Sequence, residues 1–237
     1  MIKQLYAMPQ WGIGETSMAD RAYGAIKEKL VLLHIKPGAP INELELAAEL
    51  NVGRTPVREA LKRLESDHLV VSYPRRGTFA TNVDIAELAE ITELRLALEP
   101  LAARAAAERA TPVQRQRLRQ LRELVEEVTT EIGQQSEDAK QLLPADRTET
   151  LLRLDVLVRH GIYQACGNAH LADVLARYHY LATRIWTLAI HRLPALTSHL
   201  SDHIGLLDSI VAGDGDAAAA TTIDHIEQFE ENLRSVF

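Results

Sequence analysis

Three cations recur every four residues at the start of an expected helix: Arg54, Arg58 and Lys62, within the stretch VGRTPVREALKRL. Residues four apart lie on one face of a helix, so these side chains form one positively charged strip. Cations near a helix N-terminus are disfavoured by the helix dipole, which indicates that an outside partner compensates them. A phosphate backbone would do so, and an arginine can also bind O6 and N7 of guanine in a major groove. The alternative is a solvated charged face.

The helix that carries this strip is predicted from its start and from its apolar face. Thr55 is the expected N-cap and Pro56 the first helical residue, where the missing proline N–H costs nothing. Gly53 is expected to make the preceding turn, after a short helix over residues 43–50. The residues expected to face inward are Leu44, Ala47, Ala48 and Leu50 in that short helix and Val57, Leu61 and Leu64 in the next.

Two further elements flank these helices. Apolar residues at helical spacing predict a helix from about residue 18 to residue 33. Residues 69–81 change to β-branched apolar types around Pro-Arg-Arg-Gly, which predicts a two-stranded hairpin. Its tip would place Arg75, Arg76 and Gly77 beside the cationic helix as a second positive contact. The predicted order is therefore helix, helix, turn, helix, hairpin.

Charge is distributed unevenly along the chain. The formal net charge is -7 and the isoelectric point is about 5.7. Residues 1–80 hold 11 Lys and Arg against 9 Asp and Glu, a net of +2, and the remainder holds 15 against 24, a net of -9. The acidic total thus hides a mildly basic N-terminal third, and a nucleic-acid site needs only a local positive surface.

Length and residue types set the broad class. A chain of 237 residues is long enough to form two domains. Its apolar runs fall far short of the ~20 residues that cross a bilayer, and residues 1–17 read as a leader without a signal-peptide pattern. The single cysteine, Cys166, excludes an internal disulfide and a thiolate zinc cluster. A cytoplasmic protein that is not inserted in a membrane is the expectation.

Beyond residue 81 the pattern is almost wholly helical. Helices are expected near 84–108, 112–133, 146–166, 168–191, 196–212 and 215–235. The predicted fold is mainly α, with an N-terminal domain of three helices and a hairpin over residues 18–81. A bundle of about six helices over residues 82–237 follows it.

The run INELELAAELNVGRTPVREALKRLESDHLVVSYPRRGTFAT resembles the winged helix-turn-helix of the GntR family of bacterial transcription regulators. Its RTPVREAL core and downstream PRRG carry the resemblance, which implies double-stranded operator DNA as a partner. The contacts it implies are Arg54, Thr55, Arg58 and Gly77, with Arg76 on the wing. Two residues depart from the family pattern. Gly53 replaces a serine, and His68 replaces a glycine after the recognition helix, so that helix end is expected to differ locally.

Four later segments, ELRLALEPLAARAAAERA, LDVLVRHGIYQACGN, SDHIGLLDSIVAGDGDAA and IDHIEQF, resemble the FCD-type effector domain of the FadR-like branch of that family. The resemblance implies an antiparallel helical bundle with a ligand cavity. It also implies one divalent metal, zinc or nickel-like, bound by an Asp-x3-His pair and two later histidines. Asp155, His203 and His225 match three of these positions, while Arg159 stands at the first-histidine position. His160 is adjacent but points ~100° away from that face.

Two hypotheses for this site compete. In the first, Asp155, His203 and His225 hold a metal, since three protein ligands suffice for zinc, and His199 could join them. In the second, Arg159 supplies the positive charge and binds an effector carboxylate through its planar fork. A guanidinium beside a dication is electrostatically unfavourable, so the sequence leaves the choice open.

Arg95 and Arg184 are further candidates for an effector's carboxylate, although Arg95 could instead pair with Glu99 four residues on. The combined expectation is a transcription regulator, a repressor controlled by a small carboxylic acid. A two-fold operator would require it to be a homodimer. The alternative from another class is a metal-dependent enzyme, which is disfavoured because the sequence offers no general base at a motif spacing.

Overall fold

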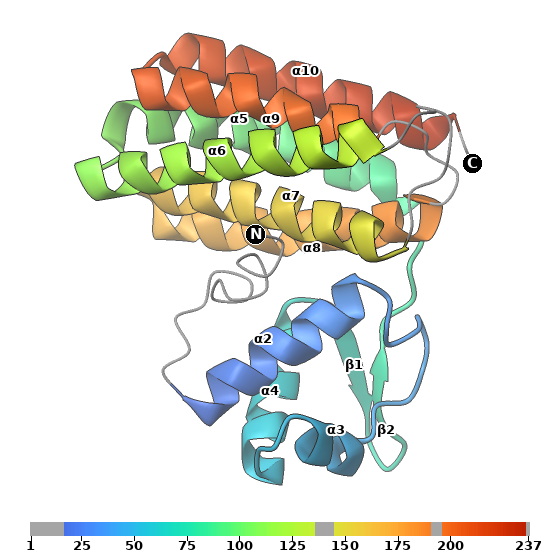
Figure 1. Cartoon of the computed structure of the whole chain (residues 1–237). Coiled ribbons are helices and arrows are strands. Elements are labelled where there is room, and N and C mark those ends of the chain that lie inside the picture. Colours follow the sequence, from blue (N-terminus) through green and yellow to red (C-terminus); the bar gives the residue numbers. More distant parts are fainter. Residues whose placement is uncertain (1–16, 136–144, 191–195, 236–237) are drawn as a thin grey trace.

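The computed structural model describes residues 17–135, 145–190 and 196–235 (Figure 1). The expected leader over residues 1–17 lies outside this part of the chain except for Ser17, which caps the first described helix. The expected gap between the helices near 168–191 and 196–212 also lies outside it. Three helices and a hairpin are followed by helices alone, so the predicted mainly α fold with an N-terminal winged helix-turn-helix is confirmed.

The N-terminal domain consists of α2 (Met18–Val31), α3 (Glu43–Glu49), α4 (Arg54–Ser66) and a hairpin of β1 (Val70–Tyr73) and β2 (Gly77–Ala80). The strands are antiparallel, with Val70 opposite Ala80 and Tyr73 opposite Gly77. Helix α4 packs against both α2 and α3. Val57, Leu61 and Leu64 are buried in that contact, as expected from their spacing. The buried face leaves the opposite side of α4 to solvent (Figure 1).

The start of α4 differs from the prediction. The N-cap is Gly53, in extended backbone and without a side-chain capping bond, so Thr55 and Pro56 already lie in the first helical turn. The left-handed residue of the turn is Asn51, with φ of 50°, while Gly53 has an ordinary negative φ. Asparagine tolerates that region because its short polar side chain can bond locally.

The prediction for α3 is also partly wrong. Leu46 and Ala47 are buried, but Leu44 and Ala48 are exposed, Leu44 with 64% of its surface accessible. A helix of seven residues makes only two turns, so its apolar pattern does not define which side packs. The consequence is that Leu44 faces solvent at the helix-turn-helix surface.

His68 takes the left-handed backbone that the usual glycine would take, with φ of 61°. The amide of His68 donates to the carbonyl of Glu65, and the amide of Leu69 donates to that of Leu64, which closes the end of α4. The helix end is thus closed by backbone hydrogen bonds with a histidine in the left-handed position. The cost is conformational strain, because a residue with a Cβ is disfavoured in this region.

We expect His68→Gly to raise the free energy of unfolding by about 0.5–1 kcal/mol, since glycine relieves the strain but has more freedom when unfolded. Urea denaturation of both proteins checks this. A lower stability of the variant would mean that the exposed imidazole makes contacts worth more than the strain.

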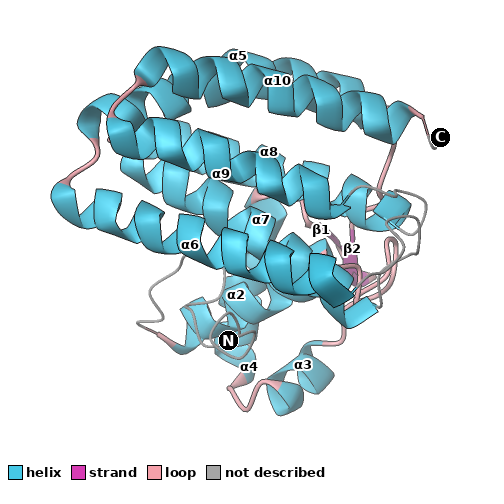
Figure 2. Ribbon diagram, turned by 45° about the horizontal axis from the view of Figure 1, so that its top comes forward, coloured by secondary structure: helices cyan, strands magenta, loops and turns pink. Residues whose placement is uncertain are grey.

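The C-terminal domain contains α5 (Glu87–Arg109), α6 (Pro112–Gln135), α7 (Ala145–Ala165), α8 (Ala169–Ala189), α9 (Leu196–Ala212) and α10 (Gly215–Arg234). These helices lie alongside one another above the N-terminal domain (Figure 2). Helix α5 packs on α10, α6 on α9, and α7 on α8. Helix α5 continues through Pro100 as one element. None of the described helices is both long and apolar enough to cross a membrane.

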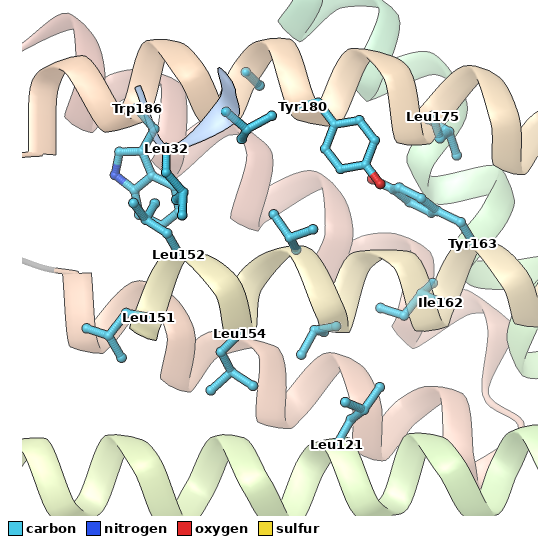
Figure 3. Packing of buried hydrophobic residues seen from close by; sticks show 14 of the residues in the cluster. Leu32, Leu121, Leu151, Leu152, Leu154, Ile162, Tyr163, Leu175, Tyr180 and Trp186 are labelled. Atoms are coloured by element: carbon cyan, nitrogen blue, oxygen red, sulfur yellow. The ribbon is translucent and has the colours of Figure 1, made fainter. Parts of the chain in front are cut away.

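Large apolar side chains fill the space between the helices. Figure 3 shows Leu152 and Tyr163 of α7 and Tyr180 and Trp186 of α8 pointing toward each other, and all four are buried. Gly161 allows α7 to approach α6 closely, because a Cβ there would lie 2.8 Å from a methyl carbon of Leu121. This close packing fixes the rotation of α7, and with it the direction of its polar residues.

Candidate functional site

The residues predicted to read DNA are all exposed to solvent. Arg54, Thr55, Arg58 and Lys62 are exposed on α4, while Arg75, Arg76 and Gly77 are exposed at the tip of the hairpin. The side chains of Arg54 and Arg58 are each 58% accessible. Their one described ionic partner is Glu43 at the start of α3. It lies 2.7 Å from Nε of Arg58 and 3.8 Å from Nη2 of Arg54.

The tip of the hairpin is a turn with an unusual backbone conformation at Arg75. The amide of Arg76 donates to the carbonyl of Tyr73 at 3.1 Å, and Arg75 has φ of 65°. With Pro74 before it, this is the arrangement of a type II turn, in which glycine or asparagine is favoured at the position of Arg75. Strain of this kind is concentrated at functional positions, which supports a role for the guanidinium at the tip.

A polar cluster lies in the interior of the C-terminal domain. Asp155 of α7, His199 and His203 of α9, and His225 of α10 each offer one ligand atom, and these atoms all lie within 4.8 Å of one another. Nε2 of His203 lies 2.7 Å from Oδ1 of Asp155, and Nε2 of His199 lies 3.7 Å from the same oxygen. Three of the four residues are fully buried and His199 is nearly so.

The charges of this cluster follow from its burial. Burial lowers the pKa of His203 to about 4, and it also lowers the pKa values of His199 and His225. The three imidazoles are therefore neutral at neutral pH, which is the form that binds metals. Burial opposes ionisation of Asp155, but the surrounding imidazoles of His179, His199 and His203 outweigh that effect and hold its pKa well below the usual value.

The residues present fit a divalent cation. One carboxylate and three neutral imidazoles suit zinc or nickel, and four ligands complete a tetrahedral zinc shell. Nε2 of His225 and Nδ1 of His203 are buried without a hydrogen-bond partner among the described residues, although buried nitrogens are normally paired. The cavity beside the cluster is small. The centre of a water-sized molecule can reach about 10 Å³ of it, so the cavity has room for about one guest of that size.

The three arginines predicted to bind an effector carboxylate lie in different places. Arg95 and Arg159 share the buried carboxylate of Glu99, at 2.6 Å each, so Arg159 points toward α5. Arg95 also lines the cavity beside Asp155. Burial raises the pKa of Glu99, but the two guanidiniums outweigh that effect and lower it to about 2. Arg184 is not brought to this cavity; it donates to the hydroxyl and the carbonyl of Thr81.

Two residues of this region were not predicted as site residues. His179 of α8 approaches Oδ2 of Asp155 at 3.2 Å and stands edge-on to Tyr163. Glu99 was expected only as a partner for Arg95, yet it also binds Arg159, sixty residues away. The available indication was an ionisable residue at an inward position of an otherwise apolar helix face.

Helix α8 touches both domains. His179, Thr183 and Trp186 line the cavity beside the Asp-His cluster. The neighbouring Tyr180 accepts a hydrogen bond from the buried Nζ of Lys27 at 3.1 Å, on the helix α2 of the N-terminal domain. Thr187 donates to the carbonyl of Val31 at the end of α2, at 3.2 Å. The same helix therefore forms a wall of the cluster and a docking surface for the N-terminal domain.

A winged helix-turn-helix joined to an all-helical domain is the arrangement of a DNA-binding regulator. The chain belongs to the GntR family of bacterial regulatory proteins, with the gntR model matching residues 18–80 and the FCD domain matching residues 90–228. Members of this family are transcription regulators that bind operator DNA, and the expectation that the chain is not an enzyme is confirmed by this membership.

Three relatives illustrate the match. The Nta operon transcriptional regulator of Aminobacter aminovorans is 46% identical over 81 residues, 34% of this chain and 39% of that protein. The transcriptional repressor RspR of Escherichia coli is 25% identical, covering 92% of this chain and 89% of its own. The E. coli regulator McbR is 30% identical over 73% of this chain and 85% of its own. The McbR structure aligns with a TM-score of 0.71 and 23% identity, over 93% and 98% of the two chains.

Proposed function

We propose that this chain is a transcriptional repressor in the cytoplasm. It would bind a two-fold operator as a homodimer and leave it when a small carboxylic acid enters the C-terminal domain. One chain offers one recognition helix and one wing, so a two-fold operator needs two copies. The exposed cations of α4 and the strained cationic tip support the DNA-binding half of this proposal.

The strained hairpin tip yields a test in which stability and DNA affinity change in opposite directions. Arg75→Gly is expected to raise the free energy of unfolding by about 1 kcal/mol, because glycine favours φ of 65°. It is also expected to weaken operator binding about 5- to 10-fold, because a phosphate contact is lost. Urea denaturation and fluorescence anisotropy measure the two effects. His68→Gly is the control, since it relieves similar strain outside the proposed contact set; equal DNA affinities of the two variants contradict the role of Arg75.

The second part of the proposal is one zinc- or nickel-like cation held by Asp155, His199, His203 and His225. The observation that supports it is that four residues bring their ligand atoms together although Arg159, and not a histidine, stands at the first-histidine position. Here His199, one turn before His203 on α9, takes the place of the ligand that Arg159 cannot provide. Bound there, the cation would supply positive charge, and a shell that expands beyond these four ligands would admit a carboxylate oxygen.

Arg159 is proposed to act beside the cation and not in place of it. Glu99 lies between Arg159 and Arg95 and offsets their charges, which reduces the repulsion that made the two hypotheses compete. Nε and Nη2 of Arg159 are buried and lack a partner in the described chain, so donors remain for a carboxylate. The proposed effector site therefore combines the cation with Arg95 and Arg159, and it leaves Arg184 to the domain contact.

The proposed control of DNA binding passes through α8. A cavity with room for about one water-sized guest is too small for a metabolite, so effector binding must move the helices that enclose it. His179 and Trp186 of α8 would then shift with Tyr180 and Thr187, which hold α2. A ligand that prefers one placement of α8 would thereby change the placement of the DNA-binding domain.

Thermal unfolding of the zinc-loaded protein in a panel of pyruvate, lactate, succinate and citrate tests the effector. At least one acid is expected to raise the melting temperature and to weaken binding to DNA from the chain's own upstream region. Arg159→Lys should lose this response, because an ammonium can pair with Glu99 but lacks the planar fork. A response of Arg159→Lys equal to that of the wild type, or no response to any acid, contradicts the proposed site.

A further inference from the structure

The carboxylate of Glu43 stands between the two arginines at the start of α4. Its Oε2 accepts a hydrogen bond from Nε of Arg58 at 2.7 Å and lies 3.8 Å from Nη2 of Arg54. Glu43 is itself held, as the first residue of α3, by the cap in which Asn42 accepts from the amides of Leu44 and Glu45. The arginine strip therefore has a fixed acidic neighbour on the next helix.

Glu43 binds Nε of Arg58, and this leaves the two terminal nitrogens of the guanidinium free. A guanidinium has five N–H donors, and the pair on Nη1 and Nη2 forms a fork that matches O6 and N7 of guanine. With Nε bound to Glu43, that fork stays available at the end of the Arg58 side chain. The bond also restricts a long side chain that is 58% accessible, which would otherwise lose more rotamer freedom on binding a base.

The same carboxylate has an opposite effect on contacts with the DNA backbone. It places a negative charge beside two cations that would otherwise be free to pair with phosphates. Phosphate contacts supply affinity without sequence information, whereas base contacts supply specificity. An acidic residue at this place should therefore lower binding to all DNA and favour the sequence that Arg58 can contact.

We infer that Glu43 is a positioning residue for operator recognition: it orients Arg58 for a base and suppresses binding to other sequences. This inference rests on the proposed role of α4 as the DNA-reading helix. A purely structural role is the alternative, because exposed ion pairs between neighbouring helices are common and contribute little to stability. Such a role would alter unfolding but would leave the ratio of operator to unrelated DNA affinity unchanged.

The test compares Glu43→Ala with Glu45→Ala, which removes the same charge from the same helical turn at an exposed residue. Fluorescence anisotropy gives Kd for a duplex taken from the DNA upstream of the protein's own gene, and for a duplex of scrambled sequence. Glu45→Ala should strengthen binding to both duplexes alike. Glu43→Ala should weaken binding to the upstream duplex about 10-fold and strengthen binding to the scrambled one. Glu43→Gln keeps an acceptor for Nε and should recover part of the preference.

Three outcomes are distinguishable. A ratio of the two Kd values that is the same within two-fold in Glu43→Ala and Glu45→Ala overturns the inference. Recovery in Glu43→Gln that equals the wild type shows that the bond to Arg58 is sufficient and that the charge has no part, which overturns the suppressing half. Absence of any preference in the wild-type chain instead rejects the proposed function of α4, before Glu43 is considered.

Discussion

Replacing Glu99 with alanine is expected to lower the free energy of unfolding by about 4 kcal/mol, because it leaves two guanidiniums buried without their shared partner. Arg95 and Arg159 are 4% and 1% exposed, so water cannot replace the lost carboxylate without opening the domain. Urea denaturation followed by circular dichroism measures the change. Glu93→Ala, at an exposed position of the same helix, is the control and should stay within ~0.5 kcal/mol of the wild type.

The pH dependence of this difference follows from the lowered pKa of Glu99. The pKa is about 2 in the folded protein against 4.5 for the free side chain, so ionised Glu99 stabilises the fold above pH 4.5. This contribution is lost as the pH falls from about 4.5 toward 2. The gap between the wild type and Glu99→Ala should therefore be constant near neutrality and narrow below pH 4.5. A gap under 1 kcal/mol at pH 7 would contradict the buried ion-pair network.

The second large effect concerns His199. His199→Ala is expected to weaken zinc binding roughly 100-fold, because a ligand of a four-residue set is lost. Competition with a chromophoric chelator measures the affinity of the folded protein directly, without reference to DNA. His170→Ala removes an exposed histidine of α8 and should leave the affinity unchanged.

The result that contradicts this assignment is equal zinc affinity in His199→Ala and His170→Ala. The cation would then be held by Asp155, His203 and His225 alone, as the sequence suggested at first. A second check is Asp155→Asn, which keeps the shape of the side chain but removes its charge. It should weaken zinc binding at least as much, because the remaining ligands are all neutral imidazoles.

Much of the fold could be predicted because the elements are long and periodic. The expected helices near 112–133 and 196–212 correspond to α6 and α9 within a few residues. The short elements were predicted less well. Helix α4 begins two residues earlier than expected, with Gly53 and not Thr55 as its N-cap, and Leu44 faces solvent, because tertiary packing and not propensity decides such cases.

The candidate site was predictable where a family pattern marks single positions and not where distant helices meet. Asp155, His203 and His225 converge as the resemblance implied. The direction of Arg159 depends on Glu99, which lies on another helix and has no local relation to it in sequence. The place of His199 likewise depends on the rotation of α9, which only the packed structure defines.

The most direct test of the account measures the affinity of one protein sample for one operator duplex with the Asp-His cluster empty and filled. Kd is determined by anisotropy for chelator-treated protein and for zinc-loaded protein with the acid that raises its melting temperature. We predict a difference of about 5- to 150-fold, and its loss in Asp155→Asn. Equal Kd values in the two states of the wild-type protein would contradict control of DNA binding from this site.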